Sequence, residues 1–333
     1  DAQEIYDRIL QFSGRRPGAP WGTAQPTVAV DVETWRPAFH SQEVVSLALS
    51  WYEGNHIVSA VWDTEGLDPF DGGVATLRRL LQDDTIAKVA HNGKFDQHAL
   101  SADTALVSMA GYVADTRLLC KMLNPTAPAD LANCAVHVGM GGHKQEARDA
   151  LQEVKKQITK YATSLAPTPR GEARPPYNPP LIPVDTIPAE LIQAMHDKDV
   201  ELDSWVYRWL PQDVRIRYNA RDTAATIKLW RELQDQLTPG QQLVLHEVVM
   251  PATHALTQME EWGLPIDRDM LNLLEAHLQM DLVPVQNRLQ SYAHILGGEF
   301  NPGSRPQLLK LMEELNLAPK GKTKTGGIST DDK

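Results

Sequence analysis

Five residues in three short motifs carry the side chains of this chain that are best suited to chemistry. They are Asp31 and Glu33 in V-A-V-D-V-E-T, Asp96 in H-N-G-K-F-D, and Tyr218 with Asp222 in Y-N-A-R-D. Each motif alone is a weak signal, because D-x-E occurs by chance in many proteins. Together the motifs describe a pocket for two divalent metal ions, an arrangement that cuts phosphodiester bonds.

The first motif supplies a pair of carboxylates on one strand. Asp31 and Glu33 are two residues apart on a strand expected over 27–33, so their side chains point to the same face. Two carboxylates held together repel each other unless a cation lies between them. Hard oxygen ligands of this kind suit Mg²⁺ or Mn²⁺. Taken by itself, the motif also fits a strand-end aspartate followed by an exposed glutamate.

The other two motifs provide the remaining groups that such a pocket requires. Asp96 follows an expected strand over 86–90 and begins a helix, where an aspartate alone is often a cap. Tyr218 and Asp222 are four residues apart on an expected helix and share one face, as a surface pair would. A two-metal site needs carboxylates from separate elements and a group that orients the attacking water. A tyrosine hydroxyl one helical turn from a ligand could orient that water.

The composition describes a globular protein of ordinary hydrophobicity. The 333 residues fit two domains, with 42% hydrophobic and 23% charged residues. Cys120 and Cys134 suggest no disulfide framework and fit a reducing cytoplasm. No apolar run approaches the ~20 residues that span a bilayer. The net charge of -11 argues against a protein that coats nucleic acid, but it leaves a nucleic-acid enzyme open.

The pattern of elements predicts an α/β fold, a mixed sheet flanked by helices, followed by an all-α segment. The expected strands are 27–33, 44–52, 56–62 and 86–90, with a hairpin turn at E-G-N. The expected helices of this part are 73–82, 95–102, 115–123, 129–138, 144–160, 188–209 and 211–237. Beyond the break at Pro239-Gly240 we expect helices over 241–262, 267–293 and 304–315.

These elements suggest three parts of the chain. They are a lead-in over 1–25, a first domain over 26–238, and a helical segment over 239–333 that ends in a basic tail. The first domain contains a proline-rich insertion over about 161–188, which we interpret as a surface loop. The amino terminus lacks both signal-peptide features and an initiating Met, which we interpret as the start of a piece of a longer protein.

The three motifs resemble the Exo I, Exo II and Exo III motifs of the DnaQ-like 3′-5′ exonucleases, in the tyrosine (DEDDy) subgroup. Arg217 stands five residues before Asp222, where the histidine subgroup would carry its histidine. The resemblance implies a ribonuclease H-like fold and a water-orienting role for Tyr218. It also implies metal ligation by Asp31, Glu33, Asp96 and Asp222. Nearby, Asp115 is not one of the ligands that the family would use, and we expect Phe95 to be a core residue.

The carboxy-terminal third is similar to family A DNA polymerases. L-H-E-V-V-M-P-A-T-H-A-L-T-Q-M-E-E-W-G-L-P-I-D-R-D-M-L (245–271) resembles the start of their polymerase region, while 300–317 and 322–330 resemble their thumb. The resemblance covers about residues 26–333 and stops before palm and fingers, so we expect no polymerase active site in this chain. It implies a proofreading exonuclease that releases nucleoside 5′-monophosphates from single-stranded or frayed DNA.

The same resemblance suggests partners and contacts. We expect a cytoplasmic monomer that binds single-stranded 3′ ends and primer-template DNA and has no membrane association. The residues expected to touch DNA are Thr34, Asn92, Lys320, Lys322 and Lys324. Trp35 and Phe39 could stack on an unpaired base or be buried. The segment H-K-Q-E-A-R (143–148) is expected to be a solvated helix face.

Two other functions remain open at the level of sequence. A stand-alone RNase D-like exoribonuclease would share the three motifs, although 245–333 fits the polymerase thumb better. A binding module that only positions DNA would keep the fold without catalysis, and the presence of all five residues argues against it.

Overall fold

The computed structural model describes residues 1–12, 26–35, 43–65, 68–142, 144–166, 172–197, 202–317, 321–322 and 328–329. The chain divides into two compact units, a first unit over residues 1–262 and a second unit over 263–333. All five residues of the three motifs belong to the first unit.

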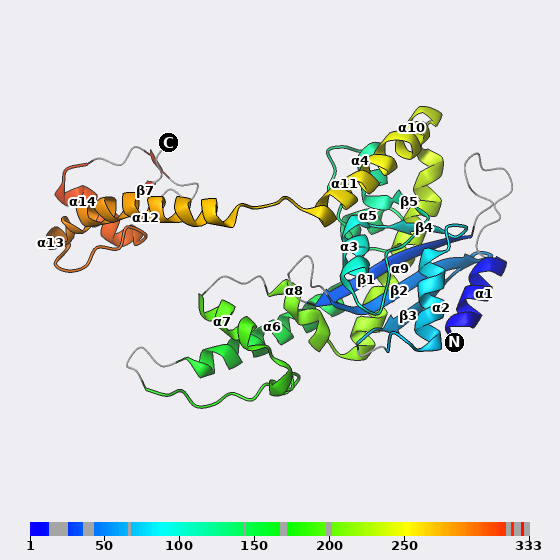
Figure 1. Ribbon diagram of the computed structural model, residues 1–333, viewed down its shortest axis with the longest axis horizontal. Coiled ribbons are helices and arrows are strands. Elements are labelled where there is room, and N and C mark those ends of the chain that lie inside the picture. Colours follow the sequence, from blue (N-terminus) through cyan, green and yellow to red (C-terminus); the bar gives the residue numbers. More distant parts are fainter. Residues whose placement is uncertain are drawn as a thin grey trace. The chain divides into compact units, whose positions relative to one another are not determined.

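The first unit is built on a five-stranded mixed sheet in the order β3-β2-β1-β4-β5 (Figure 1). The strands are β1 (Thr27–Trp35), β2 (Glu43–Glu53), β3 (His56–Asp63), β4 (Ala87–Ala90) and β5 (Tyr112–Asp115). β2 pairs antiparallel with β1 and β3, whereas β1, β4 and β5 run parallel. The expected α/β fold class, a mixed sheet flanked by helices, is confirmed. The four residues of β5 are too few to show a periodic pattern and were not expected as a strand.

The central strand β1 distributes its side chains over the two faces of the sheet. Its three valines join the main hydrophobic core and are Val28, Val30 and Val32. On the opposite face, Ala29 packs with Ile227 of α9 (Gln212–Leu233). Because side chains alternate along a strand, Asp31 and Glu33 face α9 as well.

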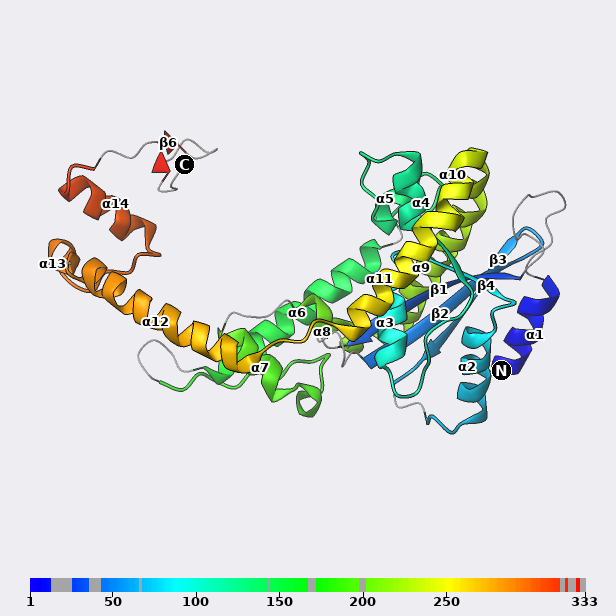
Figure 2. The same ribbon diagram turned by 45° about the horizontal axis from the view of Figure 1, so that its top comes forward.

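Helix α1 (Ala2–Phe12) lies beside α2 (Gly72–Gln82), as both Figure 1 and Figure 2 show. The first part of the expected lead-in over 1–25 is thus a helix, which the sequence analysis did not predict. Tyr6 and Ile9 are buried in the main core at helical spacing, and the Tyr6 hydroxyl donates to Asp83 at 2.5 Å.

The remaining helices of the first unit are α3 (Lys94–Ala102), α4 (Thr116–Leu123), α5 (Leu131–Val136), α6 (Gln145–Leu165), α7 (Ala189–Asp197) and α8 (Asp203–Val206), with short 3₁₀ turns η1 (Val184–Thr186) and η2 (Tyr207–Trp209). The expected helix over 188–209 is thus divided into shorter pieces. α6 continues to Leu165, beyond the expected end at residue 160.

Part of the proline-rich insertion is packed rather than a free surface loop. Ile182 is 2% exposed and belongs to a second core with Val154 and Ile158 of α6. The backbone N–H of Leu181 donates to Gln157 Oε1 at 3.0 Å. The few apolar side chains among many prolines gave too little pattern to predict this contact.

Helix α9 leads into 3₁₀ turn η3 (Gln234–Gln236), helix α10 (Pro239–Val244), π-helical turn η4 (Leu245–Val249) and α11 (Met250–Trp262). The break expected at Pro239 is a helix start, because Thr238 caps α10 and Pro239 occupies its first turn.

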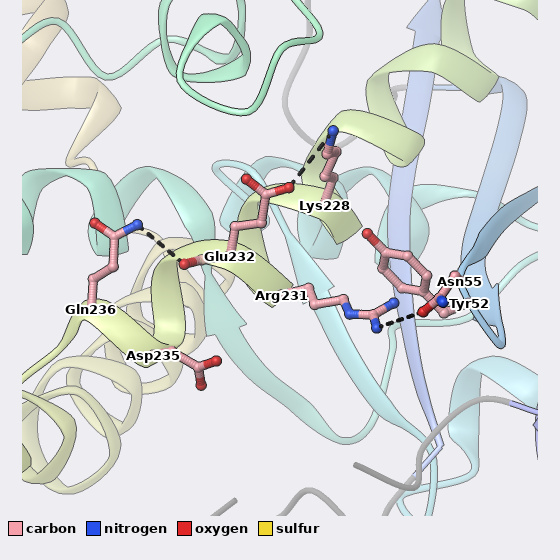
Figure 3. A pocket seen from close by; sticks show the side chains of 7 residues that line it. All are labelled: Tyr52, Asn55, Lys228, Arg231, Glu232, Asp235 and Gln236. Atoms are coloured by element: carbon pink, nitrogen blue, oxygen red, sulfur yellow. Dashed lines mark hydrogen bonds and ion pairs between the residues drawn. The ribbon is translucent and has the colours of Figure 1, made fainter.

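The hairpin between β2 and β3 turns at the expected residues. Gly54 adopts φ +62°, which glycine reaches without steric cost. The turn and the end of α9 line an open polar pocket, where the Arg231 guanidinium lies 4.0 Å from the Tyr52 ring centroid (Figure 3). The other lining residues are Asn55, Lys228, Glu232, Asp235 and Gln236. None of the five motif residues lines this pocket.

The second unit contains α12 (Arg268–Gln290), α13 (Ala293–Leu296) and α14 (Arg305–Glu314). Two short strands, β6 (Gly321–Lys322) and β7 (Ile328–Ser329), pair antiparallel in the expected basic tail. Over the part of the chain that is described, no helix has the length and apolar character needed to cross a bilayer.

Buried hydrogen bonds fix α9 against β2. Asn219 Nδ2 donates to Ser46 Oγ at 2.8 Å, and Ser50 Oγ donates to Thr223 Oγ1 at 2.7 Å. Asn219 lies between Tyr218 and Asp222 in the sequence. Its contact therefore fixes the part of α9 that carries both functional side chains against the sheet.

We expect Asn219→Ala to lower the free energy of unfolding by about 1–3 kcal/mol, because it leaves the buried Ser46 hydroxyl without its donor. Urea denaturation monitored by circular dichroism measures this change. The exposed amide Gln152 on α6 provides a control, since Gln152→Ala should leave stability nearly unchanged. Equal effects of the two substitutions would contradict the prediction.

Candidate active site

Three of the predicted carboxylates converge at the face of the sheet that α9 covers. One ligand oxygen each from Asp31, Glu33 and Asp222 lies within 4.8 Å of the other two. Asp31 and Glu33 come from β1, while Asp222 comes from the middle of α9. The spacings of two on a strand and four on a helix therefore bring the groups together as the sequence predicted.

The negative charges of this carboxylate cluster favour the binding of a cation. Burial, together with the neighbouring carboxylates, raises the pKa values of Asp31 and Glu33 well above their usual range. Asp31 Oδ2 is buried and has no hydrogen-bond partner among the described residues. An orphaned buried oxygen beside two further carboxylates fits a hard divalent ion such as Mg²⁺ or Mn²⁺.

Asp96 lies beside this cluster and is held by the backbone of β1. Its Oδ1 accepts the N–H of Val32, the residue between Asp31 and Glu33, at 2.9 Å. Burial raises the pKa of Asp96 to about 7. Asp96 is not one of the three residues whose oxygens lie within 4.8 Å of one another, so its role as a ligand stays a prediction.

Tyr218 lies one helical turn before Asp222, as predicted. Its ring lies 5.9 Å from that of Tyr207, measured between centroids. Burial and the carboxylates of Glu33 and Asp222 raise the pKa of Tyr218, so the phenol keeps its proton. A neutral hydroxyl in this position can orient a water molecule by hydrogen bonding.

Lys144 is a residue of the site that the sequence did not reveal. Its Nζ donates to Asp222 Oδ2 at 2.7 Å and to the Tyr218 hydroxyl oxygen at 3.2 Å. The expectation that 143–148 is a solvated helix face is therefore wrong for this residue, whose side chain is only 20% exposed. Lys144 directly precedes α6 and fits no periodic pattern, so only the folded chain shows its contact with α9.

Asp115 is not a member of the three-carboxylate cluster. It holds nearby segments of the chain together by hydrogen bonds. Its carboxylate accepts hydrogen bonds from three parts of the chain. The donors are the N–H groups of Asn92, Gly93, Arg117 and Leu118 and the hydroxyl of Tyr112. It thereby caps α4 and holds the turn that leads into α3, the helix of Asp96. Gly93 must be a glycine, since a Cβ there would lie 2.6 Å from the Tyr112 hydroxyl oxygen.

Asn92 and Thr34 were both expected to touch DNA. Asn92 is exposed with φ +69°, and its side chain accepts a hydrogen bond from Arg117 at 2.8 Å, so it bridges the turn. Thr34 is buried at a register shift that follows Glu33. Contacts of these two residues with DNA stay predictions.

The sequence analysis also made predictions for two aromatic residues near the motifs. Phe95 is 39% exposed, so the expectation that it is a core residue is wrong. Because Phe95 adjoins the buried Asp96 on a helix, the two side chains point in different directions. Trp35 takes the buried alternative, with its ring 5.9 Å from that of Trp205 in an edge-to-face contact.

Three residues with an expected contact lie outside the described residues. They are Phe39, Lys320 and Lys324, and of Lys322 the structure describes the backbone.

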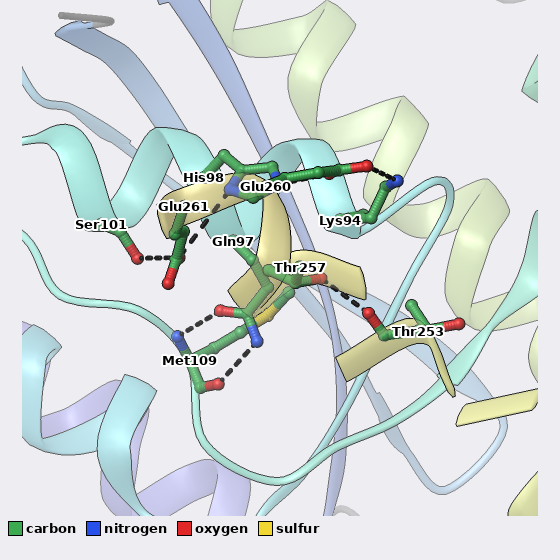
Figure 4. A network of polar contacts seen from close by, with 9 residues as sticks. All are labelled: Lys94, Gln97, His98, Ser101, Met109, Thr253, Thr257, Glu260 and Glu261. Atoms are coloured by element: carbon green, nitrogen blue, oxygen red, sulfur yellow. Dashed lines mark hydrogen bonds and ion pairs between the residues drawn. The ribbon is translucent and has the colours of Figure 1, made fainter. Parts of the chain in front are cut away.

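Helix α3 is held from outside the sheet by α11, as Figure 4 shows. The Glu260 carboxylate accepts from Lys94 at 2.5 Å and interacts with His98 Nε2 at 2.8 Å (Figure 4). Ser101 donates to Glu261 at 3.1 Å. These contacts bind the helix of Asp96 to the end of the first unit.

The mixed sheet carries buried carboxylates on the face that α9 covers. This arrangement is a candidate metal site of the kind found in nucleases. The model of the 3′-5′ exonuclease family matches residues 22–238, more than half of the chain. The chain therefore belongs to this family, in the form found as the exonuclease domain of family A DNA polymerases.

Curated relatives agree with this membership. The chain is 27% identical to DNA polymerase I of Treponema pallidum over 261 residues, which are 77% of this chain and 20% of that protein. It is 31% identical to the DNA polymerase of Escherichia phage T5 over 142 residues, 40% of this chain and 17% of that one. The chain thus spans about a fifth of the length of these relatives.

A solved structure shares the fold at low sequence identity. The POL domain of Pol1 from M. smegmatis, in complex with DNA primer-template and dNTP, matches with a TM-score of 0.52 and 18% identity. The match covers 99% of this chain and 42% of that one.

We expect binding of Mn²⁺ to release protons. Metal ions bind the deprotonated carboxylates, and the raised pKa values of Asp31, Glu33 and Asp96 (about 7 for Asp96) mean that the metal-free site retains protons near neutrality. The affinity should therefore fall as the pH is lowered from about 8 to about 6. Isothermal titration in two buffers of different ionisation enthalpy measures both effects. Equal heats in the two buffers and a pH-independent affinity would refute the prediction, and Asp31→Asn should abolish most of the signal.

Proposed function

We propose that this chain is the metal-dependent 3′-5′ exonuclease portion of a family A DNA polymerase. It hydrolyses the 3′-terminal phosphodiester of single-stranded or frayed DNA by a two-metal mechanism and releases nucleoside 5′-monophosphates. The parent enzyme would be a DNA-directed DNA polymerase.

The observation that carries the proposal is the cluster of Asp31, Glu33 and Asp222 with an orphaned carboxylate oxygen at its centre. Asp31 and Glu33 have no ion pair with a basic group among the described residues, which supports a site that binds cations. The family membership adds that residues 22–238 belong to a set of exonucleases. The curated relatives are named as DNA polymerases, which supports DNA as the substrate.

The roles of the residues follow from their positions. Asp31, Glu33 and Asp222, with Asp96, would hold two ions of Mg²⁺ or Mn²⁺. Bound ions would lower the pKa of the attacking water and stabilise the charge on the leaving oxygen. The Tyr218 hydroxyl, which keeps its proton, orients that water by hydrogen bonding and does not act as its base. Val32 contributes its N–H, which fixes Asp96 next to the other carboxylates.

The proposed contacts to the substrate lie on several elements. Phe95 of α3 is 39% exposed, and its ring is suited to stack on an unpaired base. Asn92, Thr34 and the lysines Lys320, Lys322 and Lys324 are the proposed contacts to the DNA strand. We place the protein in the cytoplasm as a monomer.

Purified protein with Mg²⁺ should shorten a 5′-labelled single-stranded DNA stepwise from its 3′ end. Asp31→Ala and Asp222→Ala should each lower kcat by at least about a hundredfold, because each removes a carboxylate that would hold the metal ions. Denaturing gel electrophoresis of the labelled strand measures the rate. Asp149→Ala on the exposed face of α6 is the matched control and should retain full activity.

The same assay separates the proposed function from the two other functions that the sequence left open. An RNA strand of the same sequence that is degraded faster than DNA would indicate an exoribonuclease. A wild-type chain that binds DNA and Mn²⁺ but shortens neither strand would indicate a positioning module.

A further inference from the structure

We propose that Lys144 is a positioning residue of the exonuclease reaction, whose ammonium group joins the Tyr218 hydroxyl to the Asp222 carboxylate. The inference rests on the proposed function and adds a residue that the three motifs do not contain. Lys144 Nζ contacts both partners at once, at 2.7 Å from Asp222 Oδ2 and 3.2 Å from the Tyr218 oxygen.

The start of α6 is fixed so that Lys144 reaches this place. Two residues further on, Glu146 pairs with Arg217 at 2.6 Å and with Arg221 at 3.6 Å. Both arginines lie on α9, next to Tyr218 and Asp222 respectively. The ion pairs therefore dock α6 on the segment of α9 that carries the functional side chains.

The lysine also supplies the charge that this corner of the site lacks. Its ammonium forms an ion pair with the buried Asp222 carboxylate at 2.7 Å. A buried carboxylate with a hydrogen-bonded cation is much less costly than an unpaired one.

The hydrogen bond to Tyr218 determines what that hydroxyl can do. An ammonium group can only donate, so it occupies a lone pair of the Tyr218 oxygen. The rotation of the hydroxyl is then restricted, and a hydrogen bond between the Tyr218 and Tyr207 side chains restricts it further. Tyr207, whose ring lies 5.9 Å from that of Tyr218, limits the ring from another side. The lysine therefore fixes the direction in which the tyrosine meets a water molecule.

Lys144→Met tests the proposal, because methionine keeps the length of the side chain but removes its donors. We expect kcat to fall about 10- to 100-fold with little change in KM, as for other residues that orient a ligand through hydrogen bonds. Lys144→Arg should recover part of this loss. Lys156→Met, the same change at an exposed position of α6, is the control and should match the wild type.

A double-mutant cycle shows whether Lys144 acts through the tyrosine. If it does, Lys144→Met should cause little further loss of kcat in a Tyr218→Phe background. If the two losses multiply instead, or if Lys144→Met alone leaves kcat unchanged, the proposal is overturned. A wild-type chain without exonuclease activity would refute the proposed function instead.

A measurement without metal or substrate tests the contact itself. In EDTA, Lys144→Met should lower the melting temperature by a few degrees, about 2–4 °C, because Asp222 loses its counter-ion. The loss should shrink in an Asp222→Asn background, where there is no charge to pair. An unchanged melting temperature of Lys144→Met in the wild-type background would show that the ion pair is absent and would overturn the proposal.

Discussion

The first unit depends on one constraint. Buried carboxylates lie close together and repel one another. Asp31, Glu33 and Asp222 place their oxygens within 4.8 Å of one another. Left alone, the arrangement would protonate or open. The fold prevents opening by placing two of the carboxylates on the central strand and the third on a helix that is fastened to β2 by buried hydrogen bonds. Protonation can be relieved only by positive charge, which is what makes the site suitable for metal ions.

The surrounding elements hold the carboxylates and their neighbours in place. The N–H of Val32 holds Asp96, and Asp115 holds the turn before the helix of Asp96. Glu146 and its arginines hold α6, which presents Lys144. Each of these supports uses a charged or backbone group close to the carboxylates.

The sequence predicted the parts of this arrangement that follow from local periodicity. Asp31 with Glu33, and Tyr218 with Asp222, share a face because strands repeat every two residues and helices every three or four. The main strands and the mixed sheet followed from the same patterns. Lys144 and the packing of Ile182 could not be predicted, because each depends on a contact between segments far apart in the chain. Phe95 was misplaced because a helix turns a neighbouring residue by about 100°, so the burial of Asp96 says nothing about the side chain beside it.

The contact between α3 and α11 limits where the chain can be truncated. The family match ends at residue 238, yet the compact unit continues to Trp262. A polypeptide cut at the family boundary would uncover the apolar surface that Leu245 and Met250 cover. It would also remove the Glu260 carboxylate from the helix that carries Asp96. A piece that contains the whole compact unit is therefore longer than the segment that the family model matches.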